Sequence, residues 1–527
     1  MGTFFRQLVP ALALLSAAVP AASAPAPVVH TASGPVAGLV RSSDHAWLGI
    51  PFAAPPVGEL RWKPPQPHAP WRAPRAAQSF GTSCAQYETM DRFAAPSAAE
   101  DCLTLNVYAP AGPVKKGAPV LVWLFGGGLS AGSANDYDPA SLVRQGAVVV
   151  TVNYRLGMLG FFANPALGAD NASSNYGILD QIAALKWVRR NIAGFGGDPR
   201  KVTIFGESAG ARSVATLIAS PLAKGLFSGA ILESLNYEAT KSSLTDAQDL
   251  GRRFARQAGC EETGIACLRG LTTAQVLDAQ RKTPPGPSFG GAVGGPDIPE
   301  TLQSALRHGR FNRVPLIIGW NHDEFTWRNA INEVERGTRA TRADYLVLAR
   351  RLGRRDPAHA DADAAAIISA YPLAGQDTPA LVMARMQTDS YFVCGTRRFL
   401  RDLAGQAPAW AYEFDVPNSP QSNRPASFPV GSAHTTEIQY LFEGFHGATG
   451  TVNALSPRQL RLARQMQRMW IALARSGKPD SAARTPRWPQ AAATGTPVLR
   501  LATSGPPLHP APYADRNCDL WDRIAGD

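Results

Sequence analysis

A serine stands between two glycines in the stretch Gly206-Glu207-Ser208-Ala209-Gly210. The spacing G-x-S-x-G lets a chain turn sharply from a strand into a helix and lifts the serine hydroxyl above the sheet. Residues 202–205 (VTIF) predict the strand and residues 211–220 the helix. A helix that begins there points its free N–H groups toward developing negative charge. The pattern therefore predicts a serine nucleophile for acyl transfer; the alternative is a tight turn with a structural role only.

Three consecutive glycines, Gly126-Gly127-Gly128, follow the apolar run at residues 119–125. Backbone N–H groups reach a tetrahedral oxyanion only where side chains do not intervene, so glycines suit such a loop. A flexible loop or a phosphate-binding loop would also be rich in glycine, but no Gly-Lys-Ser/Thr follows here. We expect the N–H groups of Gly127, Gly128 and Ala209 to form an oxyanion hole.

The elements that must position these groups can be predicted from hydrophobic patterns. The continuous apolar runs 119–125 and 147–152 indicate strands buried on both faces, and residues 175–192 carry apolar residues at helical spacing. Alternating strands and helices predict the α/β class, with a central, mostly parallel sheet flanked by helices. The pattern loosens between residues 234 and 301. Without a low-complexity linker between domains, long insertions into one core account for the length of 527 residues.

Composition narrows the classes of function. The chain is 45% hydrophobic and 18% charged, which excludes a disordered or collagen-like protein. Its 52 basic and 41 acidic residues give a net charge of +11. The longest basic cluster, at residues 350–355, has no aromatic residues interleaved with it, as is typical of a solvated helix end. We therefore expect no nucleic-acid partner.

The first residues predict export. One arginine precedes an apolar stretch at residues 8–19, and small residues follow, as in a secretory signal. Pro10 and Pro20 disfavour the alternative of a buried helix. We expect a signal peptide at residues 1–24, a mature chain 25–527 that is secreted or periplasmic, and no stable membrane anchor.

Six cysteines without a Cys-x-x-Cys pair predict three disulfides in an exported chain and disfavour a metal site, and no cofactor is expected.

Many further segments resemble the type-B carboxylesterases, the cholinesterase-like family of α/β-hydrolases. They are residues 49–53 (GIPFA), 55–58 (PPVG), 100–107 (EDCLTLNV), 153–157 (NYRLG), 177–181 (GILDQ) and 195–199 (FGGDP). The resemblance covers almost the whole mature chain. It implies an α/β-hydrolase fold in one catalytic domain, with long insertions that form a cap over an active-site gorge. It also implies that the chain hydrolyses small carboxylic esters through an acyl-enzyme.

The resemblance implies a catalytic triad of Ser208, Glu324 and His434. Glu324 lies in the segment 319–325 (GWNHDEF), in which Phe325 replaces a usual glycine, and the neighbouring Asp323 is the alternative acid. His434 follows a stretch of small residues and precedes Thr435, where the family usually has glycine. A neutral imidazole can accept the serine proton and deliver it to the leaving alcohol, while the carboxylate orients the ring.

The resemblance also implies structural pairs and departures from the family. The implied disulfides are Cys84–Cys102, Cys260–Cys267 and Cys394–Cys518, and the implied ion pairs are Arg61 with Glu100 and Arg155 with Asp180. Phe125 stands where bacterial members often have histidine, and it is a candidate for substrate binding together with Glu207.

Two other functions are alternatives: a catalytically silent adhesion or binding protein, whose relatives typically lack the nucleophile, and an amidase or peptidase that uses the same triad.

Arg212 stands four positions after Ser208, where the family usually has a small or apolar residue. On a helix this position is one turn beyond the nucleophile, and helical side chains lean toward the N-terminus. A guanidinium there can bind a substrate carboxylate on the acyl side in a bidentate pair. The alternative is a buried pair with a protein carboxylate such as Glu207. The functional interpretation predicts an acidic acyl group, as in a half-ester of a di- or tricarboxylic acid.

Overall fold

The structure is a computed structural model of the 527-residue chain. It describes residues 2, 27–87, 94–111, 117–168, 173–240, 243–261, 264–284, 289, 292–354, 358–375, 378–420, 426–445, 454–479, 488–491, 498–505, 508–509 and 512–526. The expected signal peptide at residues 1–24 lies outside the described residues, apart from Gly2.

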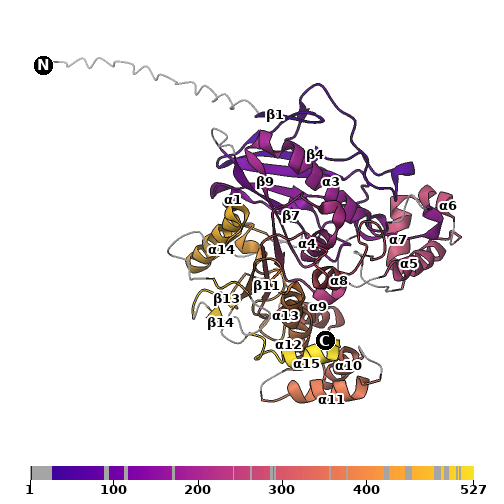
Figure 1. Ribbon diagram of the computed structural model, residues 1–527, viewed down its shortest axis with the longest axis vertical. Helices are drawn as coiled ribbons and strands as arrows, with labels where there is room; N and C mark the ends of the chain where they lie inside the picture. Colours follow the sequence, from indigo (N-terminus) through magenta and orange to yellow (C-terminus); the bar gives the residue numbers. More distant parts are fainter. Residues whose placement is uncertain are drawn as a thin grey trace.

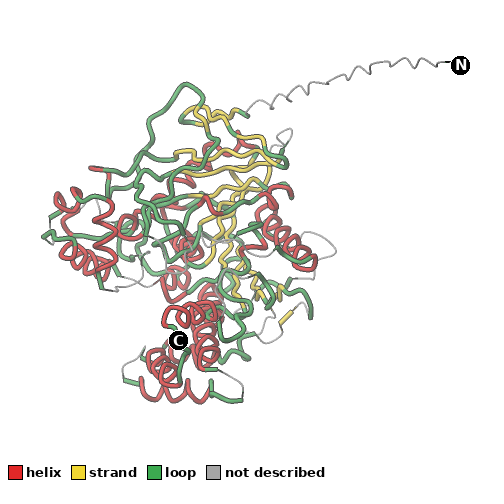
Figure 2. Tube along the Cα trace, turned by 180° about the vertical axis from the view of Figure 1, so that it is seen from behind, coloured by secondary structure: helices red, strands yellow, loops and turns green. Residues whose placement is uncertain are grey.

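A central sheet runs through the molecule, with helices on both of its sides (Figure 2). Its strands, in spatial order, are β14 (Leu508–His509), β13 (Val498–Leu501), β12 (Ala409–Phe414), β11 (Leu316–Asn321), β10 (Gly229–Glu233), β9 (Gly197–Glu207), β7 (Ala118–Leu124), β8 (Val148–Val152), β6 (Thr104–Pro110), β4 (Asp44–Pro51) and β3 (Leu39–Val40). The strands from β8 to β13 are mutually parallel, and the strands at both edges are antiparallel. A small separate sheet consists of β1 (Val28–Thr31), β2 (Gly34–Ala37) and β5 (Arg75–Ala76).

Helices fill the connections between these strands. They are α1 (Ala140–Arg144), α2 (Gly157–Gly160), α3 (Tyr176–Asn191), α4 (Ala209–Ala219), α5 (Leu244–Gln257), α6 (Ile265–Gly270), α7 (Thr273–Lys282), α8 (Leu302–Arg307), α9 (Thr326–Arg336), α10 (Arg342–Gly353), α11 (Ala360–Ala370), α12 (Pro379–Thr388), α13 (Cys394–Leu403), α14 (Pro457–Ser476) and α15 (Cys518–Ala525). Figure 1 shows α5, α6 and α7 gathered at one side of the molecule and α10, α11 and α15 at its lower end. Helices α5, α6 and α7 belong to a long insertion after β10, and α10 and α11 to one after β11, whereas α15 follows β14 near the C-terminus.

The expected α/β architecture is confirmed. The apolar runs at 119–125 and 147–152 form β7 and β8, whose residues are almost all buried, and the helix expected at 175–192 is α3. The long insertions are also present, but α5, α6 and α7 occupy the region where the sequence pattern was loose. In the described part of the chain, no helix is both long and apolar enough to cross a membrane.

Parallel register brings the carboxyl ends of four strands to one edge of the sheet. Leu124 of β7 pairs with Gly206 of β9, and Glu207 pairs with Glu233 at the end of β10. Glu233 in turn pairs with Gly319 of β11. Ligands of open α/β sheets bind outside these carboxyl ends. The loops that follow β7, β9, β10 and β11 therefore converge on one place.

The expected covalent and ionic ties are present. The disulfides Cys84–Cys102, Cys260–Cys267 and Cys394–Cys518 join as the resemblance implied. Arg61 pairs with Glu100 at 2.5 Å, and Arg155 pairs with Asp180 at 2.8 Å. All four of these charged side chains are nearly inaccessible to solvent. A buried charge is costly to leave unpaired, so each pair fixes the position of its two segments.

The two disulfides that close loops of very different length should contribute unequally to stability. On the chain-entropy model, the 124-residue separation of Cys394 and Cys518 corresponds to about 4–5 kcal/mol, and the 7-residue separation of Cys260 and Cys267 to about 2 kcal/mol. Urea denaturation of the Cys394→Ala/Cys518→Ala and Cys260→Ala/Cys267→Ala variants measures both losses. Equal losses, or a larger loss for the short loop, would contradict the expectation.

Candidate active site

Ser208 occupies a strained turn between β9 and α4. Its φ of 56° lies in the left-handed region, which side chains other than glycine rarely adopt. The two flanking glycines are required by contact with β7: a Cβ on Gly210 would lie 1.9 Å from the carbonyl oxygen of Leu124, and one on Gly206 would lie 2.5 Å from the same oxygen. The Ser208 N–H donates to the carbonyl of Glu233 at 2.9 Å. The expected strand-turn-helix context of the serine is confirmed.

The glycine loop after β7 lies beside this turn. Gly127 and Gly128 have φ values of 100° and 68°, which only glycine adopts without strain, and Gly128 lines the same cavity as Ser208 and Ala209. Ala209 is the first residue of α4, so its N–H has no acceptor within the helix. N–H groups in this arrangement can hydrogen-bond to an oxyanion bound at the serine.

Phe125 does not belong to the cavity wall, contrary to the expectation of a substrate contact. Its side chain is wholly buried, and its ring stacks on Tyr154 with the centroids 4.4 Å apart. The Tyr154 hydroxyl donates to the Phe125 carbonyl at 2.6 Å. The stacking keeps the aromatic ring in the core, so Phe125 supports the glycine loop from beneath.

Glu324, rather than Asp323, faces His434. The Nδ1 atom of His434 lies 2.5 Å from Oε2 of Glu324, and the other carboxylate oxygen accepts the N–H of Asn321 at 2.9 Å. Asp323 instead contacts Nδ1 of His322 at 2.9 Å and accepts the Ser432 N–H at 2.9 Å. The carboxylate that can orient the imidazole of His434 is therefore that of Glu324.

The two departures from the family pattern have visible structural consequences. Phe325 lines the cavity, and the centroid of its ring lies 5.8 Å from that of Phe392. Thr435 has a φ of 73°, an outlying conformation for a β-branched residue. A glycine would adopt that conformation without strain, which explains why glycine suits the position after the histidine.

Glu207 lies against His434 on the side opposite Glu324. Its Oε1 is 3.1 Å from Nε2 of His434, and its side chain is 1% exposed. Glu207 was expected to bind substrate, but its side chain contacts the histidine and is not among the residues that line the cavity. Two further carboxylates are buried close by: Glu233 accepts the indole N–H of Trp470 at 2.9 Å, and Glu437 accepts from the amide of Asn321.

Burial and these charges shift the pKa values of the group. Burial raises the pKa of Glu207 well above its usual value; the positive charge of His434 opposes this shift, and the charges of Glu437 and Glu324 add to it. Burial alone would lower the pKa of His434, but the carboxylates of Glu207 and Glu324 outweigh it and raise that pKa to about 9. The site therefore stabilises the imidazolium form, and the neutral imidazole that accepts the serine proton becomes more abundant as the pH rises toward about 9.

These groups surround one cavity, with a solvent-accessible volume of about 280 Å³. It is lined by Gly128, Ser208, Ala209, Arg212, Ser234, Asn236, Glu324, Phe325, Trp327, Arg328, Phe392 and His434. The structure thus brings together Ser208, Glu324, His434, Gly128, Ala209 and Arg212, all of which the sequence had singled out. Sequence reasoning missed Ser234, Asn236, Arg328 and the buried carboxylates Glu233 and Glu437. Position could have indicated Ser234, which directly follows β10, and Arg328, which lies in the first turn of α9, just after Glu324.

The order of the site elements along the chain identifies the class. The serine lies on a strand-to-helix turn, the acid follows β11 and the histidine follows β12. This order of nucleophile, acid and histidine on a parallel sheet is that of an α/β-hydrolase.

Comparisons with known proteins agree. Residues 25–521 match the model of the Carboxylesterase family. Fumonisin B1 esterase of Sphingopyxis macrogoltabida is 34% identical over 480 residues, which cover 88% of this chain and 84% of the relative. Para-nitrobenzyl esterase of Bacillus subtilis is 34% identical over 482 residues, covering 88% and 92%. A carboxylesterase structure from Geobacillus stearothermophilus has a TM-score of 0.79 at 30% identity and covers 94% of this chain and 99% of its own.

The chain therefore belongs to the carboxylesterase family. It has the α/β-hydrolase fold and is a serine hydrolase of carboxylic esters.

The contact between Glu207 and His434 makes a prediction about protonation. Glu207→Gln removes a negative charge 3.1 Å from Nε2, so the pKa of His434 should fall. NMR titration of protein labelled with ¹⁵N-histidine measures this pKa directly. Asp323→Asn is the matched control, because it also neutralises a carboxylate but one that contacts His322. An unchanged or higher pKa of His434 in Glu207→Gln would contradict the electrostatic interpretation.

Proposed function

We propose that the chain hydrolyses esters through an acyl-enzyme, with Ser208 as nucleophile, His434 as general base and acid, and Glu324 as the residue that orients the imidazole. The observation that carries this proposal is that Ser208 and the Glu324–His434 pair line one cavity. A catalytically silent binding protein would need neither the strained serine turn nor a carboxylate-paired histidine beside it. An amidase would use the same groups, but the relatives named above are esterases.

In the first half of the reaction, Oγ of Ser208 forms a bond to the ester carbonyl carbon while His434 takes the hydroxyl proton. The N–H groups of Gly127, Gly128 and Ala209 donate hydrogen bonds to the carbonyl oxygen and stabilise the negative charge that develops on it. The bond between that carbon and the alcohol oxygen then breaks, and His434 gives its proton to the leaving alkoxide.

In the second half, His434 takes a proton from water, and the resulting hydroxide attacks the acyl carbon. The bond to Oγ breaks, the proton returns to Ser208, and the carboxylic acid leaves. Each cycle consumes one water and yields one alcohol and one acid. Glu324 and Glu207 together stabilise the imidazolium that forms in both halves, since both carboxylates raise the pKa of His434.

The same proposal includes where the protein acts. A signal peptide at residues 1–24 would direct a single catalytic domain, 25–527, out of the cytoplasm. Three disulfides support this, because such bonds persist in secreted and periplasmic compartments. The partner is then a small-molecule ester in that compartment.

The nucleophile is tested by Ser208→Ala. Without Oγ no acyl-enzyme forms, so hydrolysis of p-nitrophenyl acetate should fall by about 10⁴-fold or more. Ser228→Ala is a suitable control, because it removes the hydroxyl of an exposed serine just before β10. Circular dichroism checks that both variants fold. A Ser208→Ala enzyme with near wild-type turnover would refute the mechanism.

The acid is tested by comparing Glu324→Gln with Asp323→Asn. The first change removes the charge that faces the imidazolium and should lower kcat on the order of 10³–10⁴-fold. The second leaves that charge in place, and asparagine can still accept the Ser432 N–H, so most activity should remain. If Asp323→Asn were the more damaging change, the acid role would pass to Asp323.

A further inference from the structure

Arg212 stands in the wall of the catalytic cavity. Its backbone N–H donates to the carbonyl of Ser208 at 3.0 Å, which places it one helical turn beyond the serine on α4. Side chains on a helix lean toward its N-terminus, here toward Ser208. Arg212 is 7% exposed and lines the cavity together with Ser208 and Ala209. Arg212 therefore borders the cavity in which an acyl group bound at the nucleophile would lie.

The charge of Arg212 persists in this buried place. Burial lowers the pKa of the guanidinium to about 10, which still leaves it almost wholly protonated at neutral pH. An interaction between charges is much stronger in a poorly solvated site than in water. A planar guanidinium also matches a carboxylate with two parallel hydrogen bonds.

Arg328 gives the same cavity a second cation. Its guanidinium lies over the ring of Trp327, 4.6 Å from the centroid, and both residues line the cavity. Among the described residues that line it, Glu324 is the one carboxylate, and its two oxygens already accept from His434 and from the Asn321 N–H. Among the described residues that line the cavity, the two arginines therefore outnumber the one carboxylate.

The geometry separates the acyl side of the cavity from the alcohol side. His434 must protonate the leaving alcohol, so the alcohol lies next to the imidazole. The ring centroids of Trp327 and Phe392 lie 5.7 and 5.5 Å from the centroid of that imidazole. Arg212 comes from a different element, because it lies on α4 directly after the nucleophile, whereas Trp327 lies on α9 and Phe392 in the helical turn at residues 389–393. The group that extends from the carbonyl carbon toward Arg212 is the acyl chain.

We propose that the preferred substrates are esters whose acyl group carries a free carboxylate, such as half-esters of dicarboxylic acids, and that Arg212 binds this carboxylate. The inference rests on the proposed ester hydrolysis at Ser208. Hydrolysis of such a half-ester consumes one water and releases an alcohol, a dicarboxylate and one proton. Arg212 thus determines specificity, and it takes no part in bond breaking.

Monoethyl succinate and ethyl butyrate form a matched pair of substrates, because they share the alcohol and differ by a carboxylate in place of a terminal methyl group. We expect wild-type kcat/KM to be roughly 10-fold or more higher for the half-ester, since hydrogen bonds to charged groups are among the strong ones. In Arg212→Met the ratio of the two kcat/KM values should fall roughly 10- to 100-fold, and Arg212→Lys should retain an intermediate ratio.

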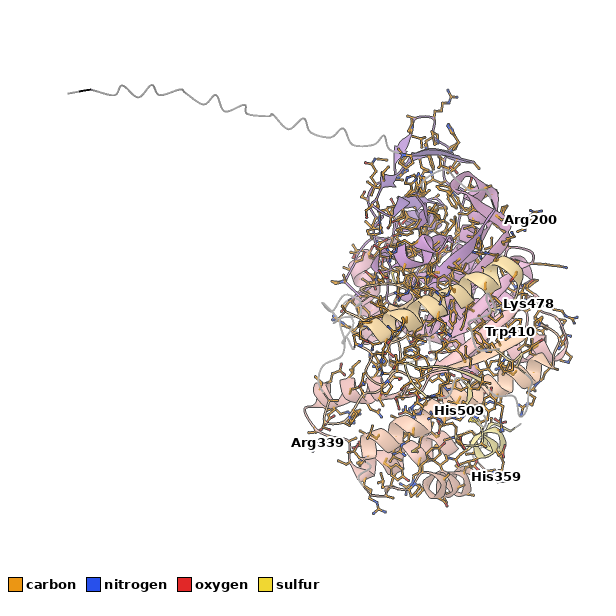
Figure 3. The ribbon with its side chains drawn as sticks, turned by 90° about the vertical axis from the view of Figure 1, so that its left-hand side faces the viewer. Arg200, Arg339, His359, Trp410, Lys478 and His509 are labelled. Atoms are coloured by element: carbon orange, nitrogen blue, oxygen red, sulfur yellow. A yellow bond between two sulfur atoms is a disulfide. The ribbon has the colours of Figure 1, made fainter. Side chains whose placement is uncertain are left out.

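Arg200→Met is the control for net charge. Arg200 is 86% exposed on the outer surface (Figure 3), and it precedes Glu207 by seven residues on β9, about 20 Å along an extended strand. Its replacement removes the same charge and should leave the substrate ratio unchanged at constant ionic strength. If Arg200→Met lowered the ratio as much as Arg212→Met, the preference would come from the overall charge, and the proposal would be wrong.

Inhibition of the wild-type enzyme gives a test that needs no variant. Succinate should inhibit the hydrolysis of ethyl butyrate competitively and at lower concentration than butyrate does. The ester formed from butyrate and glycolate carries its carboxylate on the alcohol side, and we expect it to be a poorer substrate than monoethyl succinate.

Different results would overturn the role of Arg212 in substrate preference and the proposed ester hydrolysis at Ser208. Equal or better hydrolysis of ethyl butyrate, a substrate ratio unchanged by Arg212→Met, or a preference for the glycolate ester would each overturn the role of Arg212 and leave the esterase intact. A wild-type protein that hydrolysed no ester, p-nitrophenyl acetate included, would overturn the proposed function itself.

Discussion

A histidine held between two carboxylates in the protein interior is the constraint on which the site depends. His434 contacts Glu324 through Nδ1 and Glu207 through Nε2, and all three side chains are nearly or wholly buried. Burying such charges is costly unless each one is paired and hydrogen-bonded. Part of this need is met at the end of β11, where the Asn321 N–H donates to Glu324 and the Asn321 side-chain amide donates to the neighbouring Glu437. Asn321, which provides both donors, is the last residue of β11, so the site depends on this strand ending at Asn321.

A second charged network braces the loop that carries Glu324. Arg516 donates to the carbonyl of His322 at 3.3 Å and to the carboxylates of Asp389 and Glu413 at 3.3 and 3.1 Å. Two residues later Cys518 is joined to Cys394 at the start of α13. The C-terminal segment is thus anchored behind the acid of the site, although it contributes nothing to the cavity wall among the described residues. Loss of this disulfide should weaken the support of Glu324 as well as the global stability.

Local signals and through-space contacts explain what the sequence could and could not predict. The Ser208 turn was predictable because both glycines and both flanking elements lie within a few residues, and β7 and β8 were predictable because they are buried on both faces. His434 was found only through the family resemblance, since nothing local distinguishes a histidine in a loop. Phe125 was misplaced because its stacking partner, Tyr154, is distant in sequence. The contact of Glu207 with His434 joins segments more than two hundred residues apart, so no local pattern could reveal it.

The looser region after β10 shows a different limit. Helix α5 begins with a reciprocal cap in which Ser243 and Asp246 bind each other's backbone N–H groups. This S-x-x-D signal was present in the sequence, and the buried residues of the helix, Leu250, Gly251, Phe254 and Ala255, follow it at helical spacing. A helix that buries only this narrow stripe has few apolar residues in its sequence, so its cap is the clearer signal of where it begins.

The charges of the site also bear on how a product would leave. Hydrolysis of a half-ester converts a monoanion into a dianion, and the new carboxylate forms at Ser208. That position is beside His434, whose two neighbours, Glu207 and Glu324, are both carboxylates. Once the imidazole has returned its proton to the serine, it no longer attracts the new anion and the charge of Glu324 repels it, while Arg212 still attracts the old one. An arginine at the far end of the acyl chain can therefore select an anionic substrate without trapping its product, because the catalytic end of the same cavity disfavours the charge that the reaction creates.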